Sequence, residues 1–458
     1  MLLRSREYLR LLAIAALLGV PVSAAAYGFL ALVSYLQREV FTDLPHGLGF
    51  HSAPWWWPLP VLAVGGLLAG LAIRYLPGSG GPHPAEGFKV HRAPAAADLP
   101  GILLAALATL ACGAVLGPEA PLIASSGGLV VLALRAARRD VPDQAVAVLA
   151  SAGSFAAVST LLGSPILGAF MLMEAAGLAG PTLGLVLLPG LLASGVGSLI
   201  FIGLDAWTGL GTFSLAIPGL PHFGTPTVAE FGWSVVIGLA AALVGSGIRW
   251  LGLRLQPYAL KRPPLAAVAA GLLVAGLAIA YAEGTGKPTS DVLFSGQNAL
   301  GPLIAQHGAY TAGALLVLLA CKCVAYGVSL SSFRGGPIFP ALFIGAAGGL
   351  AMSHLPGLPA VAGVAMGIGA TCVVMLNLPL TSVLLATVLL FSDGVAVMPL
   401  VIVAVVVAYV AAARLTPAPA PEKSPTLARD PNPLRVMRAA AGPATVSATE
   451  QSRGRNRG

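Results

Sequence analysis

The sequence predicts an all-helical polytopic membrane protein built from two repeated halves. Charged residues make up only 9% of its 458 residues, whereas a soluble protein carries about a quarter. Hydrophobic residues reach 57%, so most of the surface must face lipid. Breaks rich in glycine and proline interrupt the apolar segments at matching places in both halves, which is typical of transporters with broken helices.

The amino end is an apolar segment that begins with three basic residues, Arg4, Arg6 and Arg10. It imitates a secretory signal, because residues 22–24 resemble a cleavage site. The apolar run nevertheless continues through residues 27–33, which is too long for the hydrophobic part of a signal peptide. We therefore expect a retained first membrane helix, with the basic amino terminus in the cytoplasm.

Further apolar runs follow at 58–76, 101–116, 122–137, 144–162, 165–179, 183–204, 231–256, 264–282, 311–330, 338–352, 357–376, 379–391 and 395–413. Several are shorter than the roughly 20 residues that a straight spanning helix needs. Helix breaks at membrane depth survive only where protein or a water-filled cavity satisfies the freed backbone groups. The polar stretches between the runs, 39–57, 77–100, 205–230 and 283–310, are expected to be loops.

Two of the breaks occur once in each half of the chain. Residues 117–121 (GPEAP) match 336–340 (GPIFP), and a second pair of proline-opened helices begins at Pro165 and Pro379. The prolines that close the first pair of motifs are 219 residues apart, and those of the second pair 214. This agreement predicts a duplicated unit over about 10–210 and 230–413, with the two copies inverted and the site at their interface.

The carboxyl end, residues 416–458, differs in composition from everything before it. It holds seven of the 25 Lys and Arg residues, against three acids, and seven prolines. Such a segment cannot bury enough apolar area to offset the entropy of ordering. We predict a transmembrane anion-transport domain over 1–415 and a disordered basic cytoplasmic tail over 416–458, since basic tails mostly report orientation and not nucleic-acid binding.

Glu119 is the most informative polar residue, because a carboxylate between apolar runs is costly and marks a functional site by default. It stands where the apolar run 122–137 begins, so free amides and the positive end of a helix dipole lie beside it. An anion drawn to that helix start would compete with the carboxylate. A plain helix cap at the membrane surface is the alternative.

Two glycine-rich segments show related features. Residues 77–82 (PGSGGP) form a turn whose glycines allow amides to point together at an anion, although a plain interhelical turn explains them equally well. Residues 331–340 (SSFRGGPIFP) end at a helix start where the amides of Ile338 and Phe339 are free. The sequence therefore offers three broken-helix starts suited to an anion.

In their motifs and their order, these three segments resemble the CLC family of chloride channels and chloride/proton antiporters, in the form of a divergent bacterial-type member. Residues 78–82, 117–121 and 336–340 stand where the family has Gly-Ser-Gly-Ile-Pro, Gly-Arg-Glu-Gly-Pro and Gly-x-Phe-x-Pro. The resemblance covers about residues 60–410, and Lys322 ahead of the third segment fits bacterial members.

The resemblance implies that Ser79, in the turn with Gly80, gives its hydroxyl to a bound chloride. It also implies that amides near Ile338 and Phe339 bind the anion, and that Glu119 is the gating carboxylate, which enters the anion position when deprotonated and withdraws when protonated. The family members of this kind are homodimers with one pore per subunit.

The sequence departs from the family pattern in places that bear on mechanism. Pro337 has no amide proton, so one expected donor is lost or replaced by that of Phe339. Glu174 aligns with the first of two adjacent glutamates of the proton-coupled members, and the inner proton acceptor falls on Ala175. Glu174 is thus a candidate either for a proton pathway or for a carboxylate facing a wet vestibule. The family's anion-contacting tyrosine falls near Ala420, with no match there.

The leading functional prediction is transmembrane transport of chloride or a similar small anion through a pore gated by Glu119, with proton coupling left open. A fluoride/proton antiporter of the same superfamily is the first alternative, and an intramembrane lipid-modifying enzyme is an alternative of a different class. We expect no enzymatic activity, cofactor, metal or nucleic-acid partner, because the intramembrane acids are scattered singly and the histidines lack metal spacing. The expected location is the inner (plasma) membrane.

Overall fold

The computed structural model describes residues 6–88, 93–137, 143–177, 181–213, 223–390 and 394–415. These residues form helices joined by turns, and no strand occurs among them. The predicted tail over 416–458 lies outside the described residues.

The helices of the first half are α1 (Arg6–Arg38), α2 (Leu44–Gly47), α3 (Pro58–Tyr75), α4 (Leu99–Ala111), α5 (Glu119–Ala137), α6 (Asp143–Leu161), α7 (Pro165–Ala175) and α8 (Pro181–Thr208). Those of the second half are α9 (Val228–Lys261), α10 (Pro263–Thr285), α11 (Gln297–Ala305), α12 (Ala312–Ser332), α13 (Ile338–Met352), α14 (Ala360–Leu376), α15 (Pro379–Leu389) and α16 (Gly394–Leu415). Proline opens several of them, at the helix position where its missing amide proton costs nothing.

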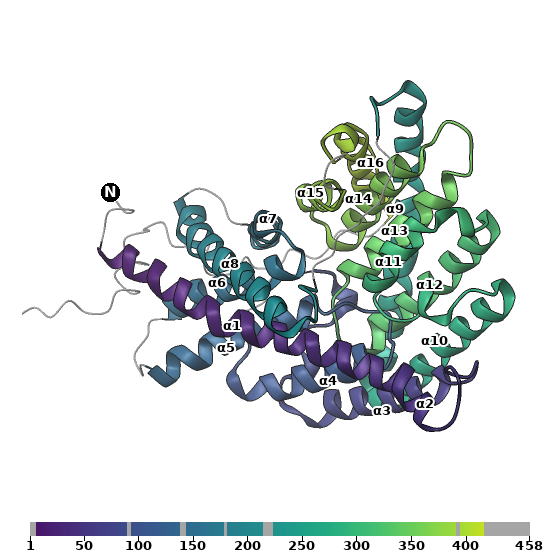
Figure 1. The fold of residues 1–458 in the computed structure, drawn as a ribbon. Helices are drawn as coiled ribbons and strands as arrows, with labels where there is room; N and C mark the ends of the chain where they lie inside the picture. Colours follow the sequence, from purple (N-terminus) through teal and green to yellow (C-terminus); the bar gives the residue numbers. More distant parts are fainter. Residues whose placement is uncertain are drawn as a thin grey trace, which may run out of the picture.

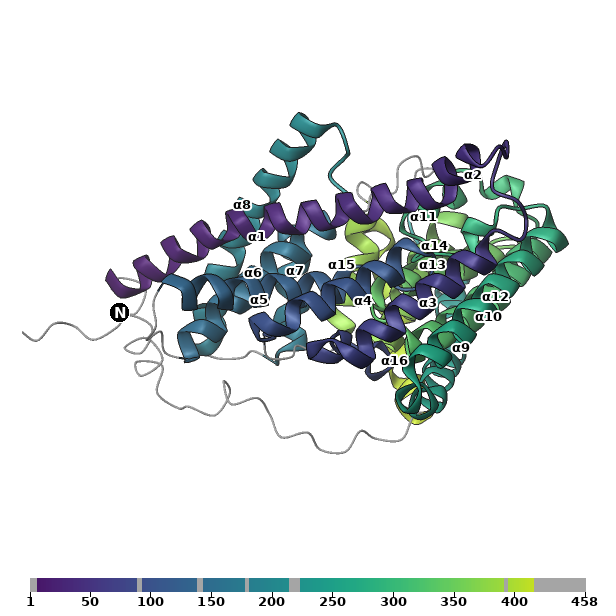
Figure 2. The ribbon, with the colours of Figure 1, turned by 90° about the horizontal axis from the view of Figure 1, so that it is seen from below.

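The two halves of the chain lie side by side. Figure 1 shows α5 to α8 on one side and α9 to α16 on the other, with α1 running along the molecule. Figure 2 shows the same division from below. The short helices α7 and α15 pack against each other across the middle, and α3 of the first half packs extensively on α10 of the second.

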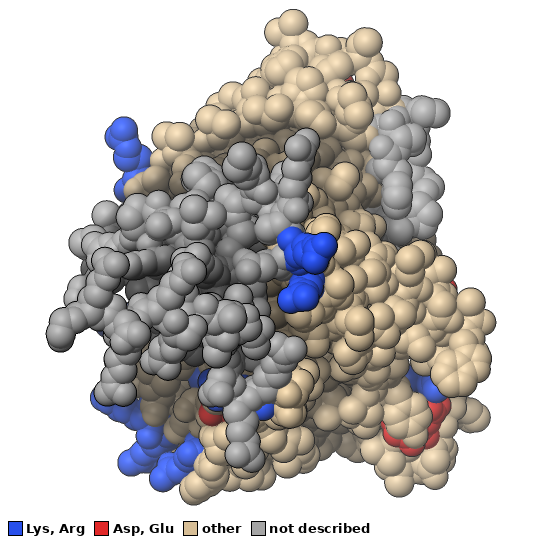
Figure 3. Space-filling view, turned by 90° about the vertical axis from the view of Figure 1, so that its left-hand side faces the viewer, with Lys and Arg blue, Asp and Glu red and all other residues tan. Residues whose placement is uncertain are grey.

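Eight helices of the described part of the chain are long and apolar enough to cross a membrane: Tyr8–Gly47, Pro58–Tyr75, Glu119–Ala137, Val186–Thr208, Val228–Lys261, Pro263–Thr285, Ala312–Ser332 and Gly394–Leu415. Large apolar side chains point outward from several of them, including Leu199, Leu243 and Leu316, which are 69%, 64% and 61% exposed. Broad areas of the face in Figure 3 likewise carry no charged side chain. The predicted multi-pass helical membrane fold is therefore confirmed.

The structure corrects the predicted loops in three places. The stretch 77–100 contains the single-turn helices Pro77–Gly80, Pro84–Glu86 and Ala96–Asp98. The stretch 283–310 contains α11 and two single-turn helices, Thr289–Asp291 and His307–Ala309. The stretch 39–57 likewise contains α2. All three stretches lack a long apolar run, so hydropathy alone predicted loops. The short helix α11 instead turns its apolar residues Leu300, Leu303 and Ile304 inward.

The paired breaks of the two halves meet at the centre of the molecule. Gly117, just before α5, and Gly336, just before α13, form an isolated antiparallel bridge. The amide of Gly117 donates to the carbonyl of Gly336 at 2.8 Å, and the reciprocal bond is 2.6 Å. This bridge holds the starts of α5 and α13 against each other.

Glycines fix α13 tightly on α14. A Cβ atom added at Gly349 would lie 2.0 Å from the carbonyl oxygen of Gly363, and one at Gly345 would lie 2.3 Å from that of Gly367. Only glycine permits such an approach of two helix backbones. The position of the α13 start, where the anion is expected, is thus set by close helix packing.

Candidate functional site

Glu119 lies at the junction of the two halves. It is the first residue of α5 and its side chain is fully buried. Its Oε1 accepts hydrogen bonds from two amides at the start of α13, a very short one from Ile338 and one of 3.1 Å from Phe339. The carboxylate of one half therefore caps the helix start of the other.

The chemistry of this contact is that of an anion site. The first amides of a helix have no partner within the helix, and the helix dipole adds positive potential there. A carboxylate, a halide or another small anion satisfies the same donors. The second oxygen, Oε2, is buried and has no hydrogen-bond partner among the described residues, so the carboxylate is only half satisfied by protein.

The two bridging glycines make room for this side chain. A Cβ at Gly117 would lie 2.0 Å from Oε2 of Glu119, and one at Gly336 would lie 2.3 Å from its Cδ. Real Cβ atoms do not approach other atoms so closely. The glycines of both motifs are therefore needed for the carboxylate to lie between the two helix starts.

Pro337 is the last residue before α13 and has no amide to offer. Phe339 provides the second donor in its place. The carbonyl of Pro337 accepts a 2.7 Å hydrogen bond from the hydroxyl of Tyr326, which is fully buried on α12. Sequence reasoning missed Tyr326, whose role depends on a turn that brings its hydroxyl back to the α13 start.

The turn that contains Ser79 and Gly80 has an unusual backbone. Ser79 has φ of +48°, between Gly78 and Gly80 at +79° and +74°. A non-glycine residue in this region is strained and commonly marks a functional site. The Ser79 residue is exposed, whereas Gly80 is buried.

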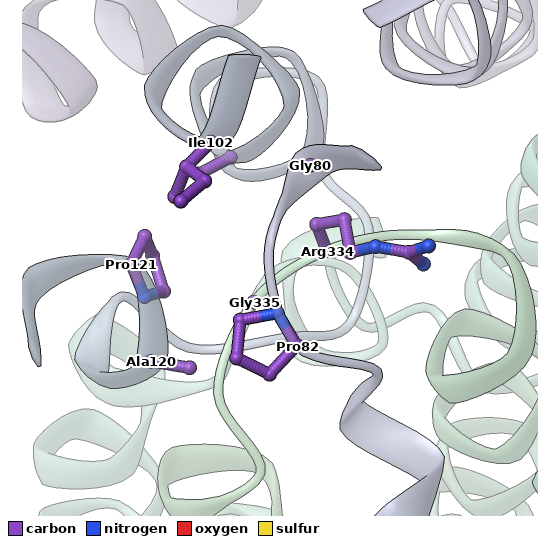
Figure 4. Close-up of a pocket in the computed structure, with 8 residues that line it drawn as sticks. Gly80, Pro82, Ile102, Ala120, Pro121, Arg334 and Gly335 are labelled. Atoms are coloured by element: carbon purple, nitrogen blue, oxygen red, sulfur yellow. The ribbon is translucent and has the colours of Figure 1, made fainter. Parts of the chain in front are cut away.

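A small cavity connects this turn to the α5 start. Its volume is about 10 Å³, close to the space that one water molecule needs. Figure 4 shows Gly80 and Pro82 on one side and Ala120 and Pro121 on the other. The remaining lining residues are Ile102, Ala106, Arg334 and Gly335. All three glycine-rich segments therefore border one space.

Glu174 lies apart from this cluster, at the end of α7. Its Oε1 accepts from the amide of Leu380 at 2.9 Å, and its Oε2 accepts from the amide of Thr381 at 2.8 Å and its hydroxyl at 2.6 Å. The carboxylate therefore caps the start of α15 and joins the two halves. The structure thus brings Glu119, Ile338 and Phe339 together, places Gly80 beside them, and leaves Glu174 outside.

Lys322 is fully buried on α12 and does not reach an anion site. Its Nζ donates to the carbonyls of Asp291, Val292 and Leu293 at 2.7, 3.1 and 3.2 Å, with Phe294 at 3.4 Å. The ammonium therefore fastens the turn that follows α10 onto α12.

Tyr409, the tyrosine nearest to the position expected from the resemblance, is 40% exposed on α16, and Ala420 lies outside the described residues.

Comparison with known proteins decides the family. The model of the voltage-gated chloride channel family matches residues 62–413. The chain belongs to this family. The resemblance drawn from the three glycine-rich segments is thereby confirmed, and so is the placing of this chain among ion-transporting membrane proteins.

Individual relatives and solved structures agree with this assignment. The Escherichia coli protein named "Putative ion-transport protein YfeO" is 29% identical over 365 residues, which are 78% of this chain and 82% of that protein. The crystal structure of a slow cyanobacterial Cl⁻/H⁺ antiporter superposes with a TM-score of 0.72 at 18% identity, covering 89% of this chain and 95% of the other. A CLC-type fluoride/proton antiporter gives 0.65 at 19% identity, covering 88% and 94%. The two structures share the fold of this chain.

Proposed function

We propose that this protein transports chloride or a similar small anion across the membrane through a pore gated by Glu119. The observation that supports this most directly is the carboxylate of Glu119 on the amides of Ile338 and Phe339. A negative charge already occupies the donors that a permeating anion would use. Withdrawal of the carboxylate would free them for the anion.

Protonation supplies a reason for the carboxylate to leave. A neutral carboxylic acid is a weaker acceptor for two amides than a carboxylate is, and it can donate a proton elsewhere. The proposed cycle therefore alternates between a carboxylate and a bound anion at the start of α13. In this proposal Ser79 gives its hydroxyl to the anion on the other side of the site, next to Gly80.

The movement of protons with the anion is the part of the proposal that distinguishes an exchanger from a passive pore. Of the solved structures that share this fold, one is a Cl⁻/H⁺ antiporter and another is a fluoride/proton antiporter. In this chain Glu174 has both oxygens occupied by the α15 start, and Ala175 stands where an inner acceptor is expected. We propose that any proton transfer passes through Glu119, with Glu174 as the candidate second group.

The setting of the pore follows from the same proposal. We place the protein in the inner (plasma) membrane as a homodimer, with the amino terminus in the cytoplasm. The transport domain would comprise residues 1–415, with repeats over about 10–210 and 230–413, and residues 416–458 would form a basic cytoplasmic tail. The facing helix starts before α5 and α13, and the contact between the proline-opened helices α7 and α15, support the duplicated arrangement.

The test is a flux measurement on liposomes that contain the purified full-length protein. Chloride efflux and proton uptake are recorded together under a chloride gradient, with the voltage clamped by potassium and valinomycin. Chloride efflux with uphill proton uptake identifies an exchanger, and chloride efflux alone identifies a passive pore. The absence of any chloride flux would contradict the proposal.

Two other functions have distinct outcomes in the same assay. Fluoride flux without chloride flux would identify a fluoride antiporter. We propose no enzymatic role; metal-dependent turnover of a lipid substrate without anion flux would favour an intramembrane enzyme instead.

A further inference from the structure

Arg334 is a buried cation at the anion site that the gating scheme does not use. It lies in the turn between α12 and α13 and is only 2% exposed. Its amide donates to the hydroxyl of Thr109 on α4 at 3.3 Å. Figure 4 shows its side chain near Gly80, with the guanidinium directed away from Ile102 and Pro121. The side chain therefore borders the cavity and places its charge behind the turn that contains Ser79.

The guanidinium connects the two loops on either side of it. Nε donates to the carbonyl of Ser79 at 3.3 Å, and Nη1 donates to that of Phe333 at 3.1 Å. Nη2 lies 3.0 Å from Nε2 of His83. These bonds hold the strained backbone of Ser79 in place. They are directed at neutral acceptors, so none of them neutralises the charge.

No described carboxylate forms an ion pair with Arg334, since the ion pair found in the described ranges joins Arg38 and Asp43. Glu86, the acidic residue near the same turn, is exposed and accepts from Gln256 at 3.4 Å. An arginine stays protonated inside proteins, and a buried charge without a counter-charge is costly. Glu86 attracts Arg334 only at longer range, so among the described residues the guanidinium has no carboxylate in contact, and a small anion would supply one negative charge.

His83 offers a further donor, on the side of its ring that faces away from the guanidinium. A guanidinium can only donate, so Nε2 of His83 accepts from it and the proton of the neutral ring lies on Nδ1. That Nδ1 is buried and has no hydrogen-bond partner among the described residues. Buried donors are normally satisfied. The Nδ1–H points away from the guanidinium, so an anion that accepts from it would lie across the imidazole ring from the charge of Arg334.

We propose that Arg334 and His83 form a cationic binding element for a small inorganic anion, behind the turn of Ser79 and separate from the amides that bind Glu119. The inference rests on the proposed transport function and identifies the charged side chain that attracts its substrate. Arg334 supplies the charge and holds the turn, and His83 supplies an additional N–H donor.

The test measures binding of chloride and of nitrate to the purified full-length protein by isothermal titration calorimetry, with liposome flux alongside. Arg334→Gln removes the charge but keeps a donor, Arg334→Lys keeps the charge, and His83→Gln removes the Nδ1 donor. Arg254→Gln is the control for the loss of one positive charge, because Arg254 is an exposed arginine on α9.

We expect Arg334→Gln to weaken anion binding about tenfold or more, since bonds to charged groups contribute this much. Arg334→Lys should recover most of the lost affinity, because lysine keeps the positive charge. If Arg334 acted only by holding the two loops through its several hydrogen bonds, lysine would not restore binding. His83→Gln should weaken binding about fivefold, and Arg254→Gln should bind like the wild type.

Binding by Arg334→Gln within about twofold of the wild type would overturn the inference, and so would equal losses in Arg334→Gln and Arg334→Lys. If Arg334→Gln does not fold, unchanged binding by His83→Gln overturns it. If the wild type conducts chloride and the variants bind anions as well as the wild type does, only the proposed role of Arg334 and His83 is refuted. A wild-type protein without any anion flux refutes the proposed function as well.

Discussion

The amide of Phe339 donates to the carboxylate of Glu119 at 3.1 Å, although the two residues are 220 positions apart in the chain. One belongs to the start of α13 and the other to the start of α5, so the contact joins the two halves of the protein. The same two backbones are bridged at Gly117 and Gly336. In the proposed mechanism one half therefore supplies the gating carboxylate and the other half the amides, and removal of the carboxylate should affect transport more than folding.

Glu119→Ala should leave the α13 amides permanently free for anions. We expect chloride efflux from liposomes at a rate at least equal to the wild type, and far less dependent on pH between 4 and 8, because the group that titrates is gone. Glu119→Gln, which resembles the protonated acid in shape and charge, should behave similarly. A variant that keeps the wild-type pH profile would show that Glu119 is not the gate.

Gly336→Ala should displace the carboxylate without removing it. The added Cβ would lie 2.3 Å from Cδ of Glu119, so the side chain must leave the amides or the backbones must separate, at a cost of about 1 to 3 kcal/mol. We expect a lower Tm and flux resembling that of Glu119→Ala. Gly348→Ala is the control, since a Cβ there meets nothing within 4 Å; equal effects of both variants would contradict the steric argument.

Much of this arrangement could be predicted from the sequence, because the residues that reveal each helix start are close together in the chain. Glycine and proline mark the helix starts at Glu119 and Ile338, and the acid between apolar runs marks the carboxylate that caps α13. Arg334 and Tyr326 were not predicted, because their roles depend on acceptors that folding brings near: Arg334 donates to the carbonyl of Ser79, 255 positions away, and Tyr326 to that of Pro337. A backbone acceptor leaves no signature in the sequence.

Lys322→Met should destabilise the second half of the protein. The substitution removes the donor for the carbonyls of Asp291, Val292 and Leu293, and each buried carbonyl left without a donor costs about 1 to 3 kcal/mol. We expect a large fall in Tm, measured by thermal unfolding in detergent. Lys287→Met is the control, because Lys287 donates to a single exposed carbonyl, that of Ala309 at 2.8 Å. Similar Tm values for both variants would show that the cluster around Lys322 contributes little.

Glu174→Gln separates a structural role from a role in proton transfer. The carboxylate accepts three hydrogen bonds at the start of α15, and the loss of a negative charge at a helix start costs up to about 2 kcal/mol. We expect a lower Tm with chloride and proton fluxes changed in proportion. Glu283→Gln, on the exposed side of α10, should leave Tm unchanged. Proton flux abolished while chloride flux continues would instead assign Glu174 to the proton pathway.

His83 should make the stability of the protein sensitive to acid. Burial, together with the charge of Arg334, lowers the pKa of His83 to about 4, and Glu86 acts in the opposite direction. In the unfolded chain the pKa of histidine is about 6.5, so between pH 6.5 and 4 the unfolded state binds the extra proton. The stability contributed by the neutral ring is therefore complete above pH 6.5 and is lost as the pH falls toward 4.

The comparison of wild type with His83→Gln isolates this contribution, because the other titrating groups are common to both proteins. We expect the wild type to lose more Tm than the variant between pH 7 and pH 5, since only the wild type has a buried ring whose protonation would place a second positive charge against Arg334. Thermal unfolding at the two pH values in the same detergent measures the difference. An identical loss of Tm in both proteins would mean that His83 accepts a proton without penalty, and that its Nε2 does not accept from the guanidinium as the 3.0 Å contact indicates.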